Sequence, residues 1–403
     1  MELIHLFHQQ HWQIIFASAA THSEQAADLS ALNAIEQRIV LNDASFNTYV
    51  AALQPDAVLF DRFFTEEQFA WRVAQECPNA LRILDSEDLH SLRHVRQQLL
   101  KNAQRVLHDN TPVLADSAEI YQHMSQDDMA QREIAAIYRC DLTLMISEYE
   151  ISLLRDYFSI PAQLLHYCPF LTVEPSSQTT LPDFAMRQHF ISIGNFRHAP
   201  NWDAVLYLKQ AIWPLIHQQL PQTQCHIYGA YQPPKATQLH NPKQGFYIKG
   251  WAENALHVVQ HARVCLAPLR FGAGIKGKLM DALRSGTPSV TTAIGAEAMT
   301  GGLPWAGRIE NTTESFADGA VQLYRDESLW QAAQQQGFAI LKQHFAKADY
   351  AQLLMERVTQ LTANLAQERQ QNFVGTLLRH QFHRSTQYMS LWIEAKNARN
   401  TDC

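Results

Sequence analysis

Residues 268–292 read PLRFGAGIKGKLMDALRSGTPSVTT and carry the strongest structural signal in the chain. A short apolar run precedes them, and Gly272, Gly274 and Gly277 lead into a helix that we expect to begin near Ile275. In such a strand, loop and helix unit, the backbone N–H groups and the positive end of the helix point at one spot. The stretch therefore predicts an anion-binding turn within an α/β domain.

Three charged side chains accompany these glycines. Lys276 and Lys278 bring two ammonium groups to the start of the helix, and Asp281 follows Lys278 by three residues on nearly the same helical face. Phosphates with a sugar hydroxyl nearby would satisfy all three groups. The alternative is a glycine-rich turn with solvated lysines and an ordinary ion pair, because a glycine loop alone is weak evidence.

A second candidate turn lies at residues 193–203, IGNFRHAPNWD. Here a predicted strand ends in Gly194, and Arg197 follows before a helix that we expect Asn201 to cap. Turns at the carboxyl edge of a parallel sheet are where α/β folds bind ligands. Arg197 is therefore a candidate phosphate ligand, and a surface arginine in a capped turn is the alternative.

Short apolar runs alternate with helical segments along the chain, which is the pattern of parallel sheets built from βαβ units. In the first half we expect strands at residues 13–18, 38–41, 57–60, 82–84, 142–146 and 163–166. Helices between them are expected at residues 66–76, 131–138 and 148–158. In the second half we expect strands at residues 190–194, 225–228, 246–249, 264–267 and 289–292.

The length of 403 residues suits two α/β domains. The polar segment TVEPSSQTT at residues 172–180 has the composition of a linker. We expect an N-terminal domain at residues 1–172, a C-terminal domain at 173–372 and a helical tail at 373–403, with strands ending near residue 310. The tail contains the amphipathic run TQYMSLWIEAK.

The overall composition limits which classes of binding partner the chain can have. Hydrophobic residues make up 46% of the chain and charged residues 18%, as in a globular protein. A formal net charge of −7 gives no overall attraction to nucleic acid or anionic lipid, so phosphate binding must come from a local cluster. We therefore expect a ligand pocket and no nucleic-acid partner.

The cysteines and the lengths of the apolar runs indicate the cellular compartment in which the chain is expected. Six cysteines form no C-x-x-C pair and no metal-ligand spacing, so we expect free thiols in the cytoplasm. No stretch reaches the roughly 18 consecutive apolar residues of a membrane-spanning helix. Membrane contact, if there is any, would be peripheral.

Residues 190–299 resemble the donor-binding domain of glycosyltransferase family 4, in the branch with a Gly-Ala-Gly-x-Lys-x-Lys loop. The family motifs G-x-F, P-N-x-D-A, P-L-R-x-G-A-G-x-K-x-K-x-x-E-A and G-A-E correspond to residues 194–196, 200–204, 268–282 and 295–297. The resemblance implies the GT-B fold, in which two Rossmann-like domains face a cleft. It also implies that the final helix packs its apolar side against the first domain.

By this resemblance, Lys276, Lys278 and Arg197 hold the diphosphate of a nucleotide-sugar donor. Asp281 takes the place of the carboxylate that binds the ribose, where the family usually has Glu, so the shorter side chain must approach more closely. The base would lie near Trp251, and an indole packed in the core is the alternative.

Two stretches of the first half resemble the family less closely. Residues 83–93, ILDSEDLHSLR, are similar to the pattern D-x-x-D-L-H-x-x-R of related transferases, which makes His90 the candidate residue facing the sugar. Helix capping by Asp85 or Asp88 explains the acids equally well. Residues 147–150, SEYE, resemble a strand-end S-x-x-E, but a Ser cap explains them fully, so we leave them out of the catalytic set.

The resemblance implies transfer of a sugar from a nucleotide-diphosphate sugar to an unidentified acceptor, with retention of configuration, no metal and no other cofactor. A bacterial cell-surface glycan is the acceptor that the family analogy suggests. The alternatives are a GT-B sugar-nucleotide epimerase and a non-catalytic GT-B partner subunit.

The beginning of the chain departs from the family pattern. Residues 2–10, ELIHLFHQQ, are typical of the first helix of a βα unit, and the strand and glycine turn that precede this helix in GT-B proteins are absent. We therefore expect Met1 not to be the natural start and the first sheet to lack its central strand, which leaves neighbouring backbone groups unpaired. The alternatives are a sheet that closes around the gap and a family variant without this strand.

Overall fold

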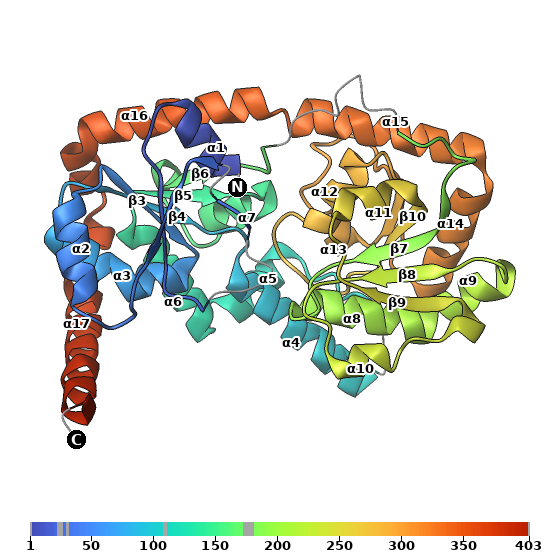
Figure 1. Ribbon diagram of the computed structural model, residues 1–403, viewed down its shortest axis with the longest axis horizontal. Helices are drawn as coiled ribbons and strands as arrows, with labels where there is room; N and C mark the ends of the chain where they lie inside the picture. The colour runs from blue at the N-terminus through green and yellow to red at the C-terminus, as the bar shows by residue number, and fades with distance from the viewer. Residues whose placement is uncertain (1, 22–26, 30–31, 108–110, 172–180, 402–403) are drawn as a thin grey trace.

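The computed structural model describes residues 2–21, 27–29, 32–107, 111–171 and 181–401, so the expected linker at residues 172–180 lies outside the described part. Two α/β domains lie side by side (Figure 1). The chain is α/β throughout, as the alternation of apolar runs and helical segments predicts. No helix among the described residues is long and apolar enough to cross a membrane.

The second domain contains a six-stranded parallel sheet in the order β12-β11-β10-β7-β8-β9. Its strands are β7 Gln188–Ile193, β8 Cys225–Tyr228, β9 Phe246–Gly250, β10 Ala262–Ala267, β11 Ser289–Thr291 and β12 Gly307–Ile309. All five expected strands are present, and β12 is an additional short edge strand held by parallel pairing with β11. The strand order reverses direction at β7, which makes this a doubly wound sheet with its ligand-binding crevice at the carboxyl edge.

Helices cover both faces of this sheet (Figure 1). They are α8 Ala199–Tyr207, a π-helical turn Leu208–Ile212, α9 Trp213–Gln219, α10 Pro234–Thr237, α11 Ala255–His261, α12 Gly277–Arg284, α13 Ala293–Ala296, α14 Thr313–Arg325 and α15 Glu327–His344. The domain core includes Phe190, Trp213 and Phe246, all almost fully buried. This packing fixes the sheet whose carboxyl ends carry the candidate site.

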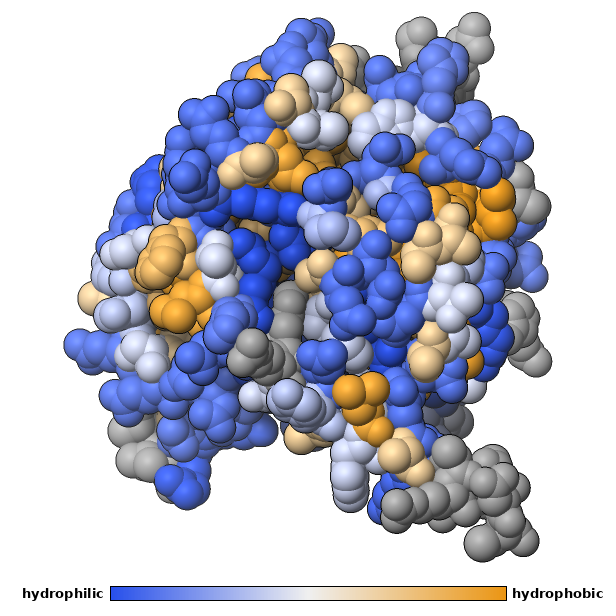
Figure 2. Space-filling view, turned by 90° about the vertical axis from the view of Figure 1, so that its left-hand side faces the viewer, coloured by the Kyte–Doolittle hydropathy of each residue, from blue (hydrophilic) through white to orange (hydrophobic). Residues whose placement is uncertain are grey.

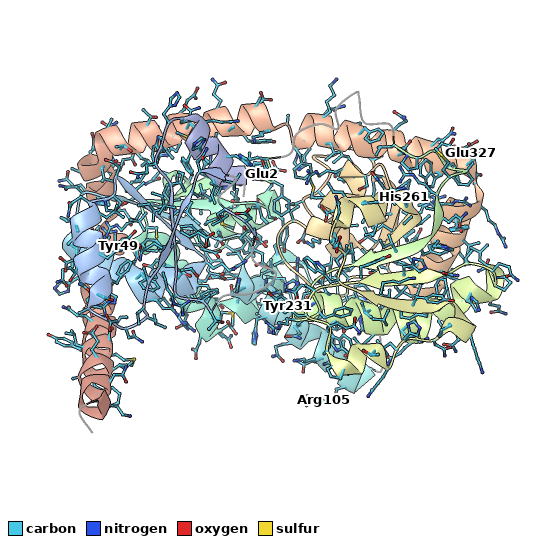
Figure 3. All side chains as sticks on the ribbon, viewed as in Figure 1. Glu2, Tyr49, Arg105, Tyr231, His261 and Glu327 are labelled. Carbon is cyan, nitrogen blue, oxygen red and sulfur yellow. The ribbon has the colours of Figure 1, made fainter. Side chains whose placement is uncertain are left out.

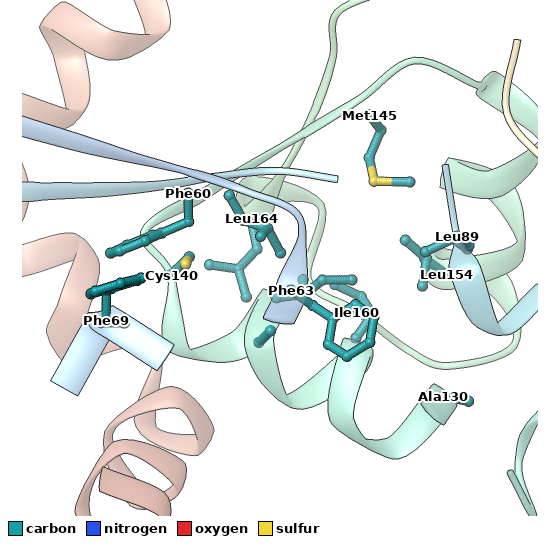
Figure 4. Packing of buried hydrophobic residues seen from close by; sticks show 14 of the residues in the cluster. Phe60, Phe63, Phe69, Leu89, Ala130, Cys140, Met145, Leu154, Ile160 and Leu164 are labelled. Atoms are coloured by element: carbon teal, nitrogen blue, oxygen red, sulfur yellow. The ribbon is translucent and has the colours of Figure 1, made fainter. Parts of the chain in front are cut away.

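The first domain contains a four-stranded parallel sheet in the order β3-β4-β5-β6 and a separate parallel pair β1-β2. The strands are β1 Ile15–Ser18, β2 Ile35–Arg38, β3 Ala57–Asp61, β4 Leu81–Asp85, β5 Leu142–Met145 and β6 Leu165–Tyr167. The helices are α1 Glu2–Gln9, α2 Ser45–Leu53, α3 Phe63–Glu76, α4 His90–Leu107, α5 Ser117–Met124, α6 Asp128–Arg139 and α7 Glu148–Asp156. Phe60, Phe63 and Phe69 pack with Cys140 and Leu164 in its core (Figure 4).

One sequence expectation and one alternative differ from the structure here. The strand expected at residues 38–41 lies at Ile35–Arg38, because its register is set by parallel pairing of Ile35 with Ile15. Among the described residues, no strand joins β1 to β3, so the sheet does not close around the gap. The prediction about what precedes Met1 stays a prediction.

The helix α16, Lys347–Gln371, returns to the first domain. Its Leu354, Val358 and Leu361 are buried in one cluster with Leu81 of β4. The expected division at residue 372 therefore lies one helix too late, because a pattern of apolar spacing does not tell which domain a long helix covers.

The tail forms one long helix, α17, Phe373–Thr401, which packs on α3 and α6 of the first domain. Its contact is polar: the guanidinium of Arg72, almost fully buried, donates to Ser390 Oγ at 2.8 Å and pairs with Glu394. Tyr388 and Trp392 are 69% and 64% exposed instead. The expectation that the apolar stripe of the tail packs inward is therefore wrong, and apolar side chains lie among hydrophilic ones on this side of the molecule (Figure 2).

Deleting the residues after Gln381 should lower the melting temperature by about 5–10 °C, because it removes two partners of the buried Arg72 guanidinium. The control is Trp392→Ala, which alters an exposed side chain and should leave the melting temperature unchanged. Differential scanning calorimetry measures both. A truncated chain with the melting temperature of the full chain would contradict the anchoring role of Arg72.

Candidate active site

The loop between β10 and α12 lies where the two domains meet. The helix begins at Gly277, two residues later than expected, with Lys276 as its N-cap residue. Gly274 has a φ of +62°, and a Cβ built there would lie 2.7 Å from the Cβ of Asp88 in the first domain. A glycine is therefore required at 274 both by the backbone and by the neighbouring domain.

The backbone N–H of Gly274 is already paired. It donates to Oε1 of Glu150 at 2.6 Å, and Oε2 of this fully buried carboxylate accepts from the N–H of Leu89 at 3.3 Å. The Ser147 cap predicted for this helix is also present, since its hydroxyl accepts from the N–H of Glu150 at 3.4 Å. Glu150, which the sequence left out of the site, is thus one residue by which the first domain binds the glycine loop.

Lys276 lies inside the same contact between the domains. Its ammonium donates to the carbonyl of Gly274 at 2.6 Å, and burial lowers its pKa to about 8 despite the nearby carboxylates of Glu297 and Glu150. Gly272 precedes it in the loop, and its carbonyl accepts from Arg96 of the first domain at 2.9 Å. Gly272, Gly274 and Lys276 therefore share a role in joining the domains.

Lys278 and Asp281 lie on α12 beside this contact and are both partly exposed. Burial lowers the pKa of Lys278 to about 8 and raises the pKa of Asp281. Gly277, the first residue of the helix, is exposed, and a Cβ built there would meet no atom within 4 Å. The sequence predicts anion binding by the N–H groups of this turn and the Lys278 ammonium, and this stays a prediction.

The turn after β7 supplies the second candidate. Gly194 packs tightly, because a Cβ there would lie 2.6 Å from the Asn201 side chain, which donates to the carbonyl of Asn195. Arg197 is exposed, and its guanidinium stacks on the ring of Tyr231 at 3.9 Å from the centroid. Tyr231 is at the side of the second domain that faces the first domain in the view of Figure 3. Lys278 of α12 is one of the charges that act on His198, the residue after Arg197, so the turn lies near α12.

Basic groups from both domains converge on this region. Desolvation lowers the pKa of His198 to about 4, and the cations Arg93 and Arg62 of the first domain and Lys278 of the second lower it further. His198 directly follows Arg197, so these charges lie near the turn after β7. Both arginines were missed in the sequence analysis. No motif marks Arg62, and Arg93 lies in the same motif as His90 but was given no role.

His90 begins α4 in the first domain. Its ring makes edge contacts with Phe63 and Phe64, with centroids 5.7 Å apart in each case. Desolvation and Arg62 lower its pKa to about 4, so the imidazole is neutral near pH 7. The first amides of α4 donate to the carboxylate of Glu133, so the predicted capping of this helix comes from a residue of α6 rather than from Asp85 or Asp88.

Trp251 follows the carboxyl end of β9 and is 54% exposed. The alternative of an indole packed in the core is therefore wrong. An exposed aromatic ring at the carboxyl edge of a parallel sheet is suited to stacking against a planar ligand group.

A buried ion pair joins the domains next to the glycine loop. Arg96 of α4 donates through two nitrogens to the carboxylate of Glu297, at 2.8 Å and 2.6 Å. Glu297 belongs to the G-A-E turn of the second domain, whose function the sequence left open. Among the described residues, no group of three His, Cys, Asp or Glu side chains could hold a metal ion.

One family model matches part of the chain. Residues 187–326 match the family model described as glycosyl transferases group 1. No curated protein sequence matches the chain.

Solved structures are similar over most of the chain at low sequence identity. Anabaena Alr3699/HepE in complex with UDP-glucose has a TM-score of 0.64 at 12% identity, covering 89% of this chain and 95% of its own. Sucrose-phosphate synthase from Thermosynechococcus elongatus has a TM-score of 0.60 at 15% identity, covering 90% and 92%. A mutant of S. aureus TarM in complex with fondaparinux, alpha-GlcNAc-glycerol and UDP has a TM-score of 0.57 at 12% identity, covering 78% and 58%, so this chain spans under two thirds of TarM.

Proposed function

With the GT-B fold of the glycosyltransferases as its framework, we propose that the chain transfers a sugar from a nucleotide-diphosphate donor to an acceptor hydroxyl. The observation that carries the proposal is the start of α12 at the contact between the domains, where Gly277 is exposed and Lys278 lies in the first turn. The N–H groups of a helix start and a nearby ammonium suit a diphosphate, which carries several negative charges. Arg62 and Arg93 of the first domain add positive charge near His198, whose pKa they lower. The match of residues 187–326 to glycosyl transferases group 1 supports the same activity.

The donor would lie along the carboxyl edge of the second sheet. Lys278 and Arg197 contact the diphosphate, Lys276 adds positive charge from beneath the loop, Asp281 binds the ribose and Trp251 stacks on the base. The neighbouring structures with UDP and UDP-glucose make uridine the first base to test. The acceptor is expected on the side of the first domain, and a bacterial glycan fits the TarM likeness.

The chemistry exchanges one bond for another at the anomeric carbon. The bond from that carbon to the phosphate oxygen breaks, the acceptor oxygen forms a new bond with retained configuration, and the proton of the acceptor hydroxyl is released to solvent water. The departing nucleoside diphosphate gains negative charge, which Lys278, the two arginines and the N–H groups of α12 stabilise without a metal ion. His90, neutral near pH 7, orients the sugar through hydrogen bonds.

The test has two stages in the full chain. Thermal shift against UDP, GDP, ADP, CDP and dTDP should reveal one that raises the melting temperature, because a ligand that binds only the folded state stabilises it by mass action. The matching nucleotide sugar should then release nucleoside diphosphate when bacterial glycan acceptors are added. Release of nucleoside diphosphate that depends on the acceptor indicates sugar transfer. Epimerisation of the sugar without such release would favour a GT-B epimerase. Binding of the donor without any turnover would favour a non-catalytic subunit.

A further inference from the structure

The glycine loop of the second domain is held from the first domain at three successive points. Arg96 binds the carbonyl of Gly272, Glu150 binds the N–H of Gly274 and Asp88 packs closely against Gly274. These contacts join residues more than a hundred positions apart in the chain. The loop geometry is therefore not a property of the second domain alone.

The charges in this contact are balanced and buried. Arg96 and Glu297 form a bidentate pair with side chains 6% and 17% exposed. The buried ammonium of Lys276 donates to the carbonyl of Gly274, and the carboxylates of Glu297 and Glu150 are near enough to act on its pKa. Two cations and two carboxylates are thus grouped at this contact. A buried ion pair costs much of its attraction in desolvation, so it contributes little net stability, but removing one partner leaves an uncompensated charge. Such a cluster specifies one arrangement of the two domains more than it stabilises either.

The loop also sets the position of the proposed phosphate ligands. Lys276 is the N-cap residue of α12, and Lys278 lies in the first turn that follows. A shift of the loop would move the first N–H groups of the helix and the Lys278 ammonium together. Phosphate binding depends on such groups meeting at one spot, and a displacement of about 1 Å can cost about a hundredfold in rate.

We propose that Arg96 and Glu150 are positioning residues: from the first domain they hold the loop at residues 272–276 in its donor-binding form. The diphosphate site is then complete only when the domains are in contact. This inference rests on the proposed donor binding. It adds Arg96, which lies in none of the quoted motifs, and gives a role to Glu150, which the sequence analysis left out of the catalytic set.

The experiment compares three variants of the full chain, Arg96→Met, Glu150→Ala and the control Arg72→Met. The control is matched because Arg72 is also a buried arginine paired with a partly exposed carboxylate, at 2% and 19%, but on the far side of the first domain. Amide hydrogen exchange of a peptide covering residues 270–279 reports on the loop without any nucleotide. Calorimetry measures the Kd of the nucleoside diphosphate that binds the wild type best.

In Arg96→Met and Glu150→Ala we expect at least about tenfold faster exchange in this peptide and a Kd about tenfold higher, which corresponds to about 1.4 kcal/mol. Arg72→Met should lower the melting temperature and change neither quantity. If amide exchange of the loop is unchanged in both Arg96→Met and Glu150→Ala, the proposal is overturned. Faster amide exchange with an unchanged Kd for the nucleoside diphosphate overturns it as well. A wild type that binds no nucleoside diphosphate overturns the proposed function instead. Amide exchange of the loop still reports whether Arg96 and Glu150 hold it in place.

Discussion

Gly274→Ala is expected to lower transfer activity by about a hundredfold, through two separate costs. A left-handed backbone costs an alanine about 1–2 kcal/mol. Its Cβ would also lie 2.7 Å from the Cβ of Asp88 and 3.2 Å from Ile146 Cδ1, closer than packed carbon atoms approach. Because Asp88 and Ile146 belong to the first domain, relieving the overlap moves the two domains apart and disturbs the donor loop.

Gly302→Ala is the matched control, because Gly302 also has a left-handed backbone, with a φ of +85°, but a Cβ there would meet no atom within 4 Å. This variant should lose a little stability and keep its activity. Small-angle scattering should show a larger radius of gyration for Gly274→Ala alone. Equal losses of activity in the two variants would mean that backbone strain, and not the contact between domains, explains the effect.

The role of Gly274 illustrates what the sequence could not predict. The pattern of glycines and lysines correctly indicated a strand, a loop and a helix. It placed Gly274 in an anion-binding turn, whereas the neighbours of Gly274 in the structure are Asp88 and Glu150 of the other domain. Local spacing predicts local structure, but a contact between distant segments depends on how the domains pack.

Arg62 shows the same limit in the candidate site. It has a φ of +67° directly after β3, an uncommon conformation for a residue other than glycine, and no neighbouring motif marks it. Its relation to His198 emerges only when both domains are folded. In α17 the amphipathic pattern was present, yet Ser390 and Glu394 on its polar side are the residues that contact Arg72.

Replacing Lys278 with alanine is expected to weaken binding of the nucleoside diphosphate by about 10- to 150-fold. A charge-assisted hydrogen bond to phosphate is worth about 1.5–3 kcal/mol, and each 1.4 kcal/mol is a factor of about ten. Calorimetry at pH 7 measures the change in Kd. An unaltered Kd would remove Lys278 from the phosphate site, and the match of the glycine loop to the family would then describe fold alone.

The pH dependence provides a sharper form of this prediction. Burial lowers the pKa of Lys278 to about 8, so its ammonium loses its proton and its charge as the pH rises through that value. Affinity for the diphosphate should therefore be full near pH 7 and decline above pH 8. Lys278→Arg supplies the control, because a guanidinium stays charged up to about pH 12 and should preserve whatever affinity the variant has between pH 7 and pH 10. The same decline in both proteins would assign the pH effect to another group, and a wild type with constant affinity up to pH 10 would show that the Lys278 charge is not what holds the phosphate.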